Sequence, residues 1–77
     1  MTLMHAESDR IYRIVSVSGD GDRHRRLLDM GFTPGSEVYV AGYAPFGGTV
    51  LVSLRGFSVA LRENAADLIN VECADGL

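Results

Sequence analysis

The side chains best suited to catalysis or metal binding are two histidines and one cysteine, His5, His24 and Cys73. Nucleophilic catalysis needs a Ser, Cys or Thr beside a general base, and neither histidine lies in a pattern that supports such a pair. The three residues also lack metal-site spacings such as C-x-x-C or H-x-x-x-H, although His5 and Cys73 can approach if the termini meet. We therefore expect no catalytic residue, no metal site and no cofactor.

The basic cluster is Arg23-His24-Arg25-Arg26. On a helix it could contact phosphates or an acidic protein surface. Acidic residues lie nearby in the sequence, at Asp20, Asp22 and Asp29. We interpret the cluster as a solvated face neutralised by these carboxylates.

Two of these arginines have different expected roles. Neighbours on a helix point about 100° apart, so Arg25 and Arg26 face different surroundings. Arg26 precedes the apolar Leu27, and we assign it to a structural ion pair with an acidic neighbour. We expect Arg25 to face solvent or to contact a partner.

A second candidate surface is the apolar loop of Tyr43, Pro45 and Phe46, which lies beside two glycines. Exposed aromatic rings at a turn need a packing partner, which is either another protein or the end of the chain's own core. An aromatic ring in a short loop can anchor an interface at low entropic cost. We predict Arg25, Tyr43, Pro45 and Phe46 as partner-binding residues.

Length and composition limit the functions that these residues can serve. The 77 residues carry 47% hydrophobic and 22% charged side chains, which is typical of one globular domain, residues 1–77 with a core at about 11–71. So small a domain has little interior left for a substrate cavity, so we expect no enzyme. The net charge of −3 provides no overall attraction for nucleic acid.

The cellular location follows from cysteine use and hydropathy. One cysteine cannot form an internal disulfide, and no secretory leader is evident, so we expect a cytoplasmic protein. The uncharged stretch 38–54 approaches the length of a membrane helix, but Gly42, Pro45 and Gly47 interrupt it. It is typical of two strands joined by a turn, so we expect no membrane insertion.

Hydrophobic periodicity predicts the elements that position these residues. β-Branched residues predict a strand over 11–17, and the Leu27 and Met30 spacing predicts a helix over 22–30, started by Asp22 and ended by Gly31. A type II turn at 33–36 follows, with Gly35 at positive φ. The first ten residues show no period, and we expect them to pack loosely as a leader.

The rest of the chain alternates as strands do. We predict strands over 37–44, 49–54, 57–61 and 69–71, with Phe57, Val59 and Leu61 facing inward. A helical turn over 64–68 presents Ala65 and Leu68, and residues 73–77 are expected to fray. The fold class is mainly β: a small barrel that closes on itself, with a helix after the first strand and a helical turn before the last.

One series of motifs resembles a known family. Arg26-Leu27, Met30-Gly31-Phe32 and Pro34-Gly35 precede a strand, and later come Gly56, Val59-Ala60-Leu61-Arg62 and Ala65 through Ile69-Asn70-Val71. This order and spacing resemble the FeoA family of ferrous iron transport accessory proteins over about Ile11 to Val71. The resemblance implies an SH3-like barrel.

The resemblance also implies a function. A FeoA-like chain would be a cytoplasmic, non-enzymatic protein that binds the FeoB transporter, a membrane protein with a cytoplasmic GTP-binding domain. It would modulate or assemble that transporter, and a peripheral position at the inner membrane through this partner and a weak homo-oligomer are both compatible with this role.

Two other classes of function stay open. A nucleic-acid-binding small barrel would use Arg23, Arg25 and Arg26 with Tyr39 or Tyr43 as stacking platforms. A metal-sensing or metal-carrying domain is the other class, since the same barrel occurs at the C-terminus of metal-dependent repressors that resemble the diphtheria toxin repressor. Tight stoichiometric binding of ferrous iron would distinguish this class, and the sequence leaves open any weak transition-metal binding by His5, His24 or Cys73.

Overall fold

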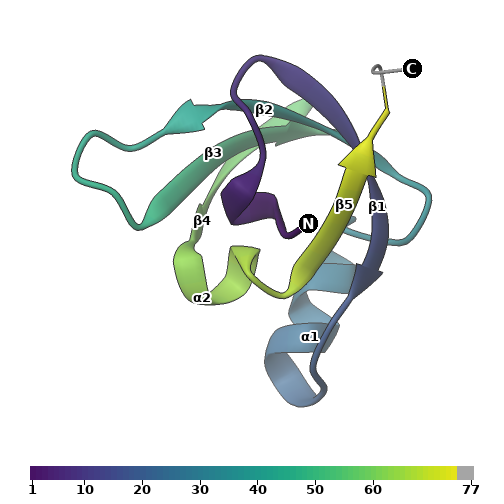
Figure 1. Ribbon diagram of the computed structural model, residues 1–77. Coiled ribbons are helices and arrows are strands. Elements are labelled where there is room, and N and C mark those ends of the chain that lie inside the picture. The colour runs from purple at the N-terminus through teal and green to yellow at the C-terminus, as the bar shows by residue number, and fades with distance from the viewer. Residues whose placement is uncertain (75–77) are drawn as a thin grey trace.

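The computed structural model describes residues 1–74, and their elements follow the order expected for a mainly β domain. They are η1 (Leu3–His5, a turn of 3-10 helix), β1 (Arg10–Val17), α1 (Gly21–Asp29), β2 (Glu37–Tyr43), β3 (Thr49–Leu54), β4 (Phe57–Arg62), α2 (Glu63–Ala66) and β5 (Ile69–Cys73). Figure 1 shows the strands curving around a shared interior, with α1 at one end. None of the helices in this part of the chain is long and apolar enough to cross a membrane.

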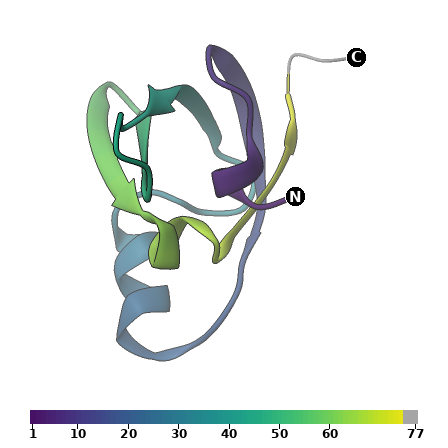
Figure 2. The same ribbon diagram turned by 60° about the vertical axis from the view of Figure 1, so that its left-hand side comes forward.

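The strands form one antiparallel sheet in the order β4-β3-β2-β1-β5. The sheet curls, and a register shift in β1 and another in β2 bend it further. We expected it to close on itself, but β4 and β5 do not pair. The short helices η1 and α2 lie in the space between these end strands (Figure 2), because each supplies buried apolar side chains that fill the interior there.

Helix α1 and the turn after it lie where the apolar spacing predicts them. Leu27 is its one buried residue, and Gly31 ends the helix at a φ of +111°. The predicted start of α1 was wrong, because Asp20 rather than Asp22 is the N-cap. The Asp20 side chain makes no capping hydrogen bond. The type II turn is confirmed: the Ser36 amide donates to the Thr33 carbonyl over 3.0 Å, and Gly35 has a φ of +92°.

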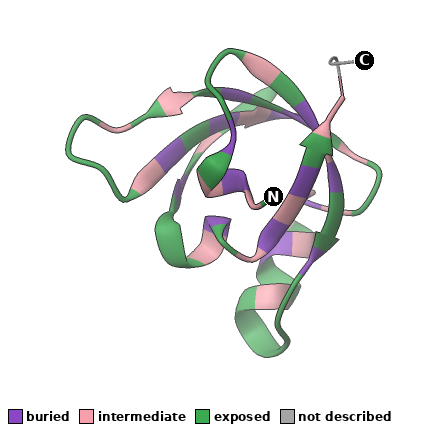
Figure 3. Cartoon of the chain, viewed as in Figure 1, coloured by how far each residue is buried: buried purple, intermediate pink, exposed green. Residues whose placement is uncertain are grey.

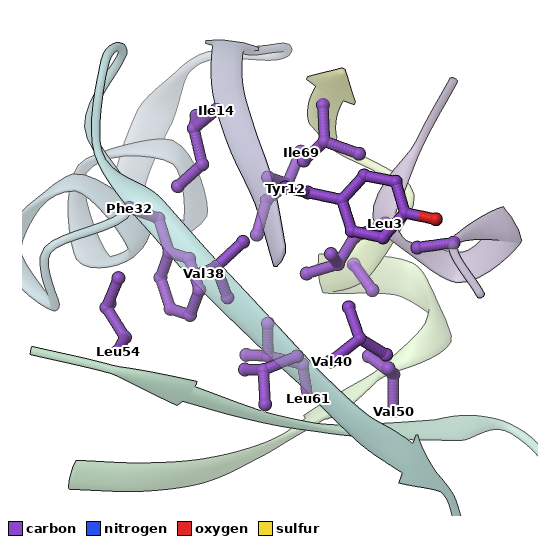
Figure 4. Packing of buried hydrophobic residues seen from close by; sticks show 14 of the residues in the cluster. Leu3, Tyr12, Ile14, Phe32, Val38, Val40, Val50, Leu54, Leu61 and Ile69 are labelled. Atoms are coloured by element: carbon purple, nitrogen blue, oxygen red, sulfur yellow. The ribbon is translucent and has the colours of Figure 1, made fainter. Parts of the chain in front are cut away.

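The core joins the inner faces of all five strands to α1, η1 and α2. Figure 4 shows Phe32, which lies three residues after the last residue of α1, beside Leu54 and Val38, so the segment after α1 fills one end of the barrel. Ala66 is fully buried on α2, whereas the predicted Ala65 and Leu68 are only partly buried. Helix α2 ends at Ala66, two residues earlier than expected, and Ala65 and Leu68 pack at the margin of the core.

The N-terminal residues are not a loose leader, so that prediction was wrong. Leu3 is fully buried and Ala6 is nearly so. Thr2 forms an antiparallel bridge with Asn70, and the Val71 amide donates to the Met1 carbonyl over 2.8 Å. The first residues therefore pair with the outer edge of β5 and close one end of the core.

Two strand predictions also need correction. Phe57 was expected to face inward, but it is 45% exposed. It lies beside the β3–β4 turn on an end strand, where few neighbours can cover it. Strand β5 continues to Cys73, so residue 73 is not frayed, and residues 75–77 of the predicted tail lie outside the described residues.

Candidate docking surface

The loop between β2 and β3 presents a fully exposed aromatic ring. The Gly47 amide donates to the Ala44 carbonyl over 3.0 Å, which closes a turn with Pro45 and Phe46 at its central positions. Gly47 follows at a φ of +81°, where a side chain would be strained. Phe46 is 100% exposed at the tip of this turn. An ordered hairpin therefore holds an apolar side chain entirely in solvent.

Tyr43 lies at the base of this hairpin, at the end of β2, and contacts the N-terminal segment. Its hydroxyl donates to the Ala6 carbonyl, and the Met4 and Leu3 carbonyl oxygens lie 3.2 and 3.4 Å away. Desolvation, and then the nearby Tyr12, raise the pKa of the Tyr43 phenol. The hydroxyl is thus used within the chain, and only the 36% exposed ring is available to a partner.

The basic face of α1 is not neutralised as expected. Arg23, Arg25 and Arg26 are exposed, and no carboxylate within residues 1–74 lies within 4.0 Å of their guanidinium groups. The structural ion pair assigned to Arg26 is therefore wrong for the described chain. Figure 3 shows most of α1 exposed. The helix presents positive charge in a chain whose net charge is −3.

The predicted site residues fall into two groups. Tyr43, Pro45 and Phe46 lie at the β2–β3 hairpin, whereas Arg25 lies on α1. Both views place the hairpin above the helix, with α2 between their levels (Figures 1 and 2). The structure therefore does not bring Arg25 and Phe46 together as a single patch.

The outer face of the sheet adds Ile11 and Leu51, which the sequence analysis did not assign to a surface, to Tyr39, which it named only as a stacking platform for nucleic acid. Ile11 pairs with Tyr39, and both are more than a third exposed, as is Leu51. The Tyr39 hydroxyl donates to the Asp9 carboxylate, and this hydrogen bond, followed by desolvation and the carboxylate charge, raises the pKa of Tyr39. Alternation in the strands predicts this second apolar face, but only the structure shows that it is uncovered.

Two hollows flank strand β4. The outer hollow has a volume of about 330 Å³ and is lined by Ala41, Leu51, Val52, Ser58, Val59 and Ala60. The α1 hollow has a volume of about 320 Å³ and is lined by Asp22, Arg23, Arg26, Leu27, Met30, Leu61 and Ala65. The second hollow thus combines an apolar floor with two guanidinium groups and one carboxylate.

The residues suited to chemistry lie in separate environments. His5 Nδ1 is 3.1 Å from the Thr2 hydroxyl, and His24 Nδ1 is 3.4 Å from the Ser18 carbonyl. The Cys73 thiol accepts a hydrogen bond from Arg10 over 3.0 Å. Within the part of the chain that the structure describes, no three His, Cys, Asp or Glu side chains are arranged to hold a metal ion.

The surface just described occurs on a fold with known relatives. The FeoA domain family matches residues 1–73, which confirms the resemblance and extends it over the N-terminal segment. No curated protein matches the sequence. Among solved structures, iron(II) transport protein A from Clostridium thermocellum is similar at a TM-score of 0.92 and 33% identity, covering 99% of this chain and 47% of that one.

Two further structures support the same assignment. A FeoA-like protein from Clostridium acetobutylicum has a TM-score of 0.89 and 30% identity, covering 100% of this chain and 90% of that one. The zinc complex of Stenotrophomonas maltophilia FeoA, a prokaryotic SH3 domain protein, has a TM-score of 0.82 and 29% identity, covering 94% and 89%. The chain spans about half of the first relative and most of these two. With an SH3-like fold and a family match over nearly its whole length, the chain belongs to the FeoA family.

Proposed function

We propose that this chain is a non-enzymatic, cytoplasmic accessory protein of ferrous iron uptake that binds the FeoB transporter and modulates or assembles it. Membership of the FeoA family supports the pathway, since one relative is an iron(II) transport protein A. The observation that carries the docking role is Phe46, which an ordered hairpin holds fully in solvent. Such a ring has the size and rigidity of an interface anchor.

The docking residues that we propose are Pro45 and Phe46 at the hairpin tip, the ring face of Tyr43 beneath them, and Arg25 on α1. Because Arg25 lies apart from the hairpin, it would act as a charge at the rim that speeds association with an acidic surface. The FeoB cytoplasmic GTP-binding region is the partner, and binding there would place the chain at the inner membrane peripherally. To regulate the transporter, the chain must bind one of its conformations more tightly than another.

A nucleic-acid partner is disfavoured by the surroundings of the aromatic rings. Tyr39 donates its hydroxyl to the Asp9 carboxylate, so negative charge lies beside the ring that would stack on a base. The hydroxyl of Tyr43 is likewise directed at main-chain carbonyls. Phosphates would be repelled at the first ring, and the α1 arginines alone do not form a continuous basic track.

The test compares Phe46→Ala and Arg25→Glu for binding to the isolated FeoB cytoplasmic region, after circular dichroism has shown that both variants fold. Phe46→Ala should weaken binding by roughly 1 to 3 kcal/mol, and Arg25→Glu should mainly slow association in a salt-dependent way. Val15→Ala is the control, since it truncates a 50% exposed apolar side chain on β1, outside the proposed docking residues and outside β4.

If Phe46→Ala and Arg25→Glu bind like the parent protein, the proposed docking residues are wrong. If the parent protein itself does not bind, the proposed partner is wrong. A salt-dependent shift with an oligonucleotide would then favour the nucleic-acid alternative.

A further inference from the structure

Strand β4 is an end strand with a regular, unprotected edge. It pairs with β3 through six consecutive residue pairs without a register shift. No other strand within residues 1–74 pairs with β4. Proteins usually protect such an edge with a bulge, a proline or inward charges, and β4 has only Arg62, at its end.

The hairpin geometry shows which main-chain groups face outward. The β3–β4 turn has two residues, Arg55 at a φ of +53° and Gly56 at +88°, as in a type I′ turn. In such a hairpin the pair Leu54 and Phe57 exchanges hydrogen bonds, and the bonded pairs then alternate along the ladder. The N–H and C=O groups of Ser58 and Ala60 therefore point away from β3, toward the open side.

The two hollows adjoin β4 on opposite faces of the sheet. A strand beside β4 would direct alternate side chains to opposite faces of the sheet. Those on the side of Ser58 and Ala60 would lie beside the outer hollow, which extends from β4 over β3 to Ala41 on β2, and those on the side of Leu61 would face the α1 hollow. Main-chain partners at an edge with pockets for alternate side chains are the features of strand addition.

Charge indicates the chemistry of the occupant. Arg23 and Arg26 line the α1 hollow, and neither has a carboxylate within 4.0 Å in the described chain. Asp22 lines the same hollow, so its formal charge is +1 from two arginines and one aspartate. A side chain with an apolar stem and a terminal carboxylate would bury the stem against Leu27 and Met30 and pair with the guanidinium groups.

From the open edge, the flanking hollows and the charge, we infer that β4 binds an extended segment of the partner as an added strand. The segment carries small or apolar side chains toward the outer hollow and a carboxylate toward Arg23 and Arg26. This inference rests on the proposed function, since the segment belongs to the FeoB cytoplasmic region. The edge adjoins the β2–β3 loop, because the Glu63 amide donates to the Gly48 carbonyl over 2.9 Å.

A second copy of this chain fits the edge less well than such a partner. If two β4 strands paired, the added strand would be Phe57–Arg62, whose sequence FSVALR contains no Asp or Glu. The one charged group of that strand is Arg62, which has the same sign of charge as Arg23 and Arg26. Charge complementarity therefore favours an acidic segment from another protein.

Hydrogen exchange of the full chain, free and with the FeoB cytoplasmic region, tests the inference at single amides. The Ser58 and Ala60 amides should exchange quickly in the free protein and at least about tenfold more slowly in the complex, because they gain main-chain acceptors. Val59 and Leu61, which bond to β3, should be protected in both states. They serve as internal controls on the same strand.

Two variants test the same edge by affinity. Ala60→Pro removes an outward N–H at a position where an end strand tolerates proline, and it should weaken binding roughly tenfold. Arg26→Glu reverses one charge of the α1 hollow and should also weaken binding, with less loss at high salt. Arg55→Glu makes the same change of charge at the β3–β4 turn, outside both hollows, and should bind like the parent. If Ala60→Pro does not fold, Arg26→Glu and the exchange data decide the matter.

The outcomes separate this inference from the proposed function. Binding with slower exchange at Ser58 and Ala60 supports both. Binding with unchanged exchange at these amides overturns strand addition and leaves the partner in place. Slower exchange in the protein alone at higher concentration identifies a second copy as the occupant and overturns the acidic partner segment. The absence of any binding overturns both proposals.

Discussion

The two edges of the sheet differ in whether another segment of the described chain pairs with them. The outer edge of β5 pairs with the first residues of the chain, through the Thr2 bridge to Asn70 and the Met1 carbonyl. The edge of β4 has no such cover within the described chain, and two hollows flank it. Each edge presents main-chain groups that the neighbouring strand does not use, so the two edges differ in whether another segment of the described chain pairs with those groups. One edge serves stability, and we propose that the other serves recognition.

Deleting residues 1–6 should have the largest effect, because it converts the covered edge into a second open edge. The deletion removes Leu3 and Ala6 from the core and the main-chain partners of β5. We expect loss of cooperative unfolding or concentration-dependent self-association, measured by thermal melting and light scattering. Leu3→Ala is the milder form, with an expected loss of about 2 to 5 kcal/mol. A deleted chain that stays monomeric and melts like the parent would show that the cover is dispensable.

Leu27→Ala tests the packing of α1 beside the open edge of β4. Leu27 is 3% exposed and lines the α1 hollow, so its truncation should reduce the free energy of unfolding by about 2 to 5 kcal/mol. Denaturant titration measures this loss. Leu28→Ala, on the same helix but only partly buried, should cost clearly less. Equal losses for the two variants would contradict the packing described for α1.

Gly35→Val should destabilise the domain without altering either edge of the sheet. It therefore gives a reference loss of stability against which the variants at the edges can be compared. A β-branched residue is strained at the φ of +92° found there, and roughly 1 to 3 kcal/mol is expected. Nothing lies within 4 Å of an added Cβ, so the loss comes from the backbone alone. Asn, which tolerates positive φ, should recover part of the stability in the same melting experiment. A neutral Val variant would mean that the turn relaxes.

Tyr43→Phe should have the smallest effect of these changes, about 1 kcal/mol, because it removes one hydrogen bond to the segment that covers β5. Its pH dependence is more informative. Desolvation raises the folded-state pKa of Tyr43 above the usual tyrosine value of 10.0, so its contribution to stability is present below pH 10 and is lost as the pH rises through the folded-state pKa. Urea titrations at rising pH should show a shallower alkaline loss in Tyr43→Phe. An identical loss would assign it to Tyr39, whose pKa is also raised.

Much of the barrel could be predicted because its signals are local. Leu27 and Met30 at helical spacing placed α1, and Pro34-Gly35 specified the turn that begins β2. The pairing of the N-terminal residues with β5 could not be predicted. The 3-10 helix η1 is a single turn without hydrophobic periodicity, and Asn70, which pairs with Thr2, lies far away in the sequence. The stability of this N-terminal segment comes from long-range pairing and burial of Leu3.

The candidate site was predictable only in part. Phe46 was identified because an aromatic residue beside glycines in a hairpin has nothing local to pack against, and it is fully exposed. The α1 arginines were wrongly expected to be neutralised, because nearness in sequence does not set side-chain direction, and their carboxylate neighbours are not within 4.0 Å. The open edge of β4 depends on which strands fail to pair, a property of the whole topology.

The N-terminal segment that pairs with β5 also affects the order in which parts of the protein can fold during synthesis. The β3–β4 hairpin, with its two-residue turn, needs only neighbouring residues and can form within microseconds. The pairing of Thr2 with Asn70 must wait until Asn70 has left the ribosome. Until then the edge of β5 stays uncovered, and covering it joins residues that lie far apart in the sequence, at a cost in loop-closure entropy.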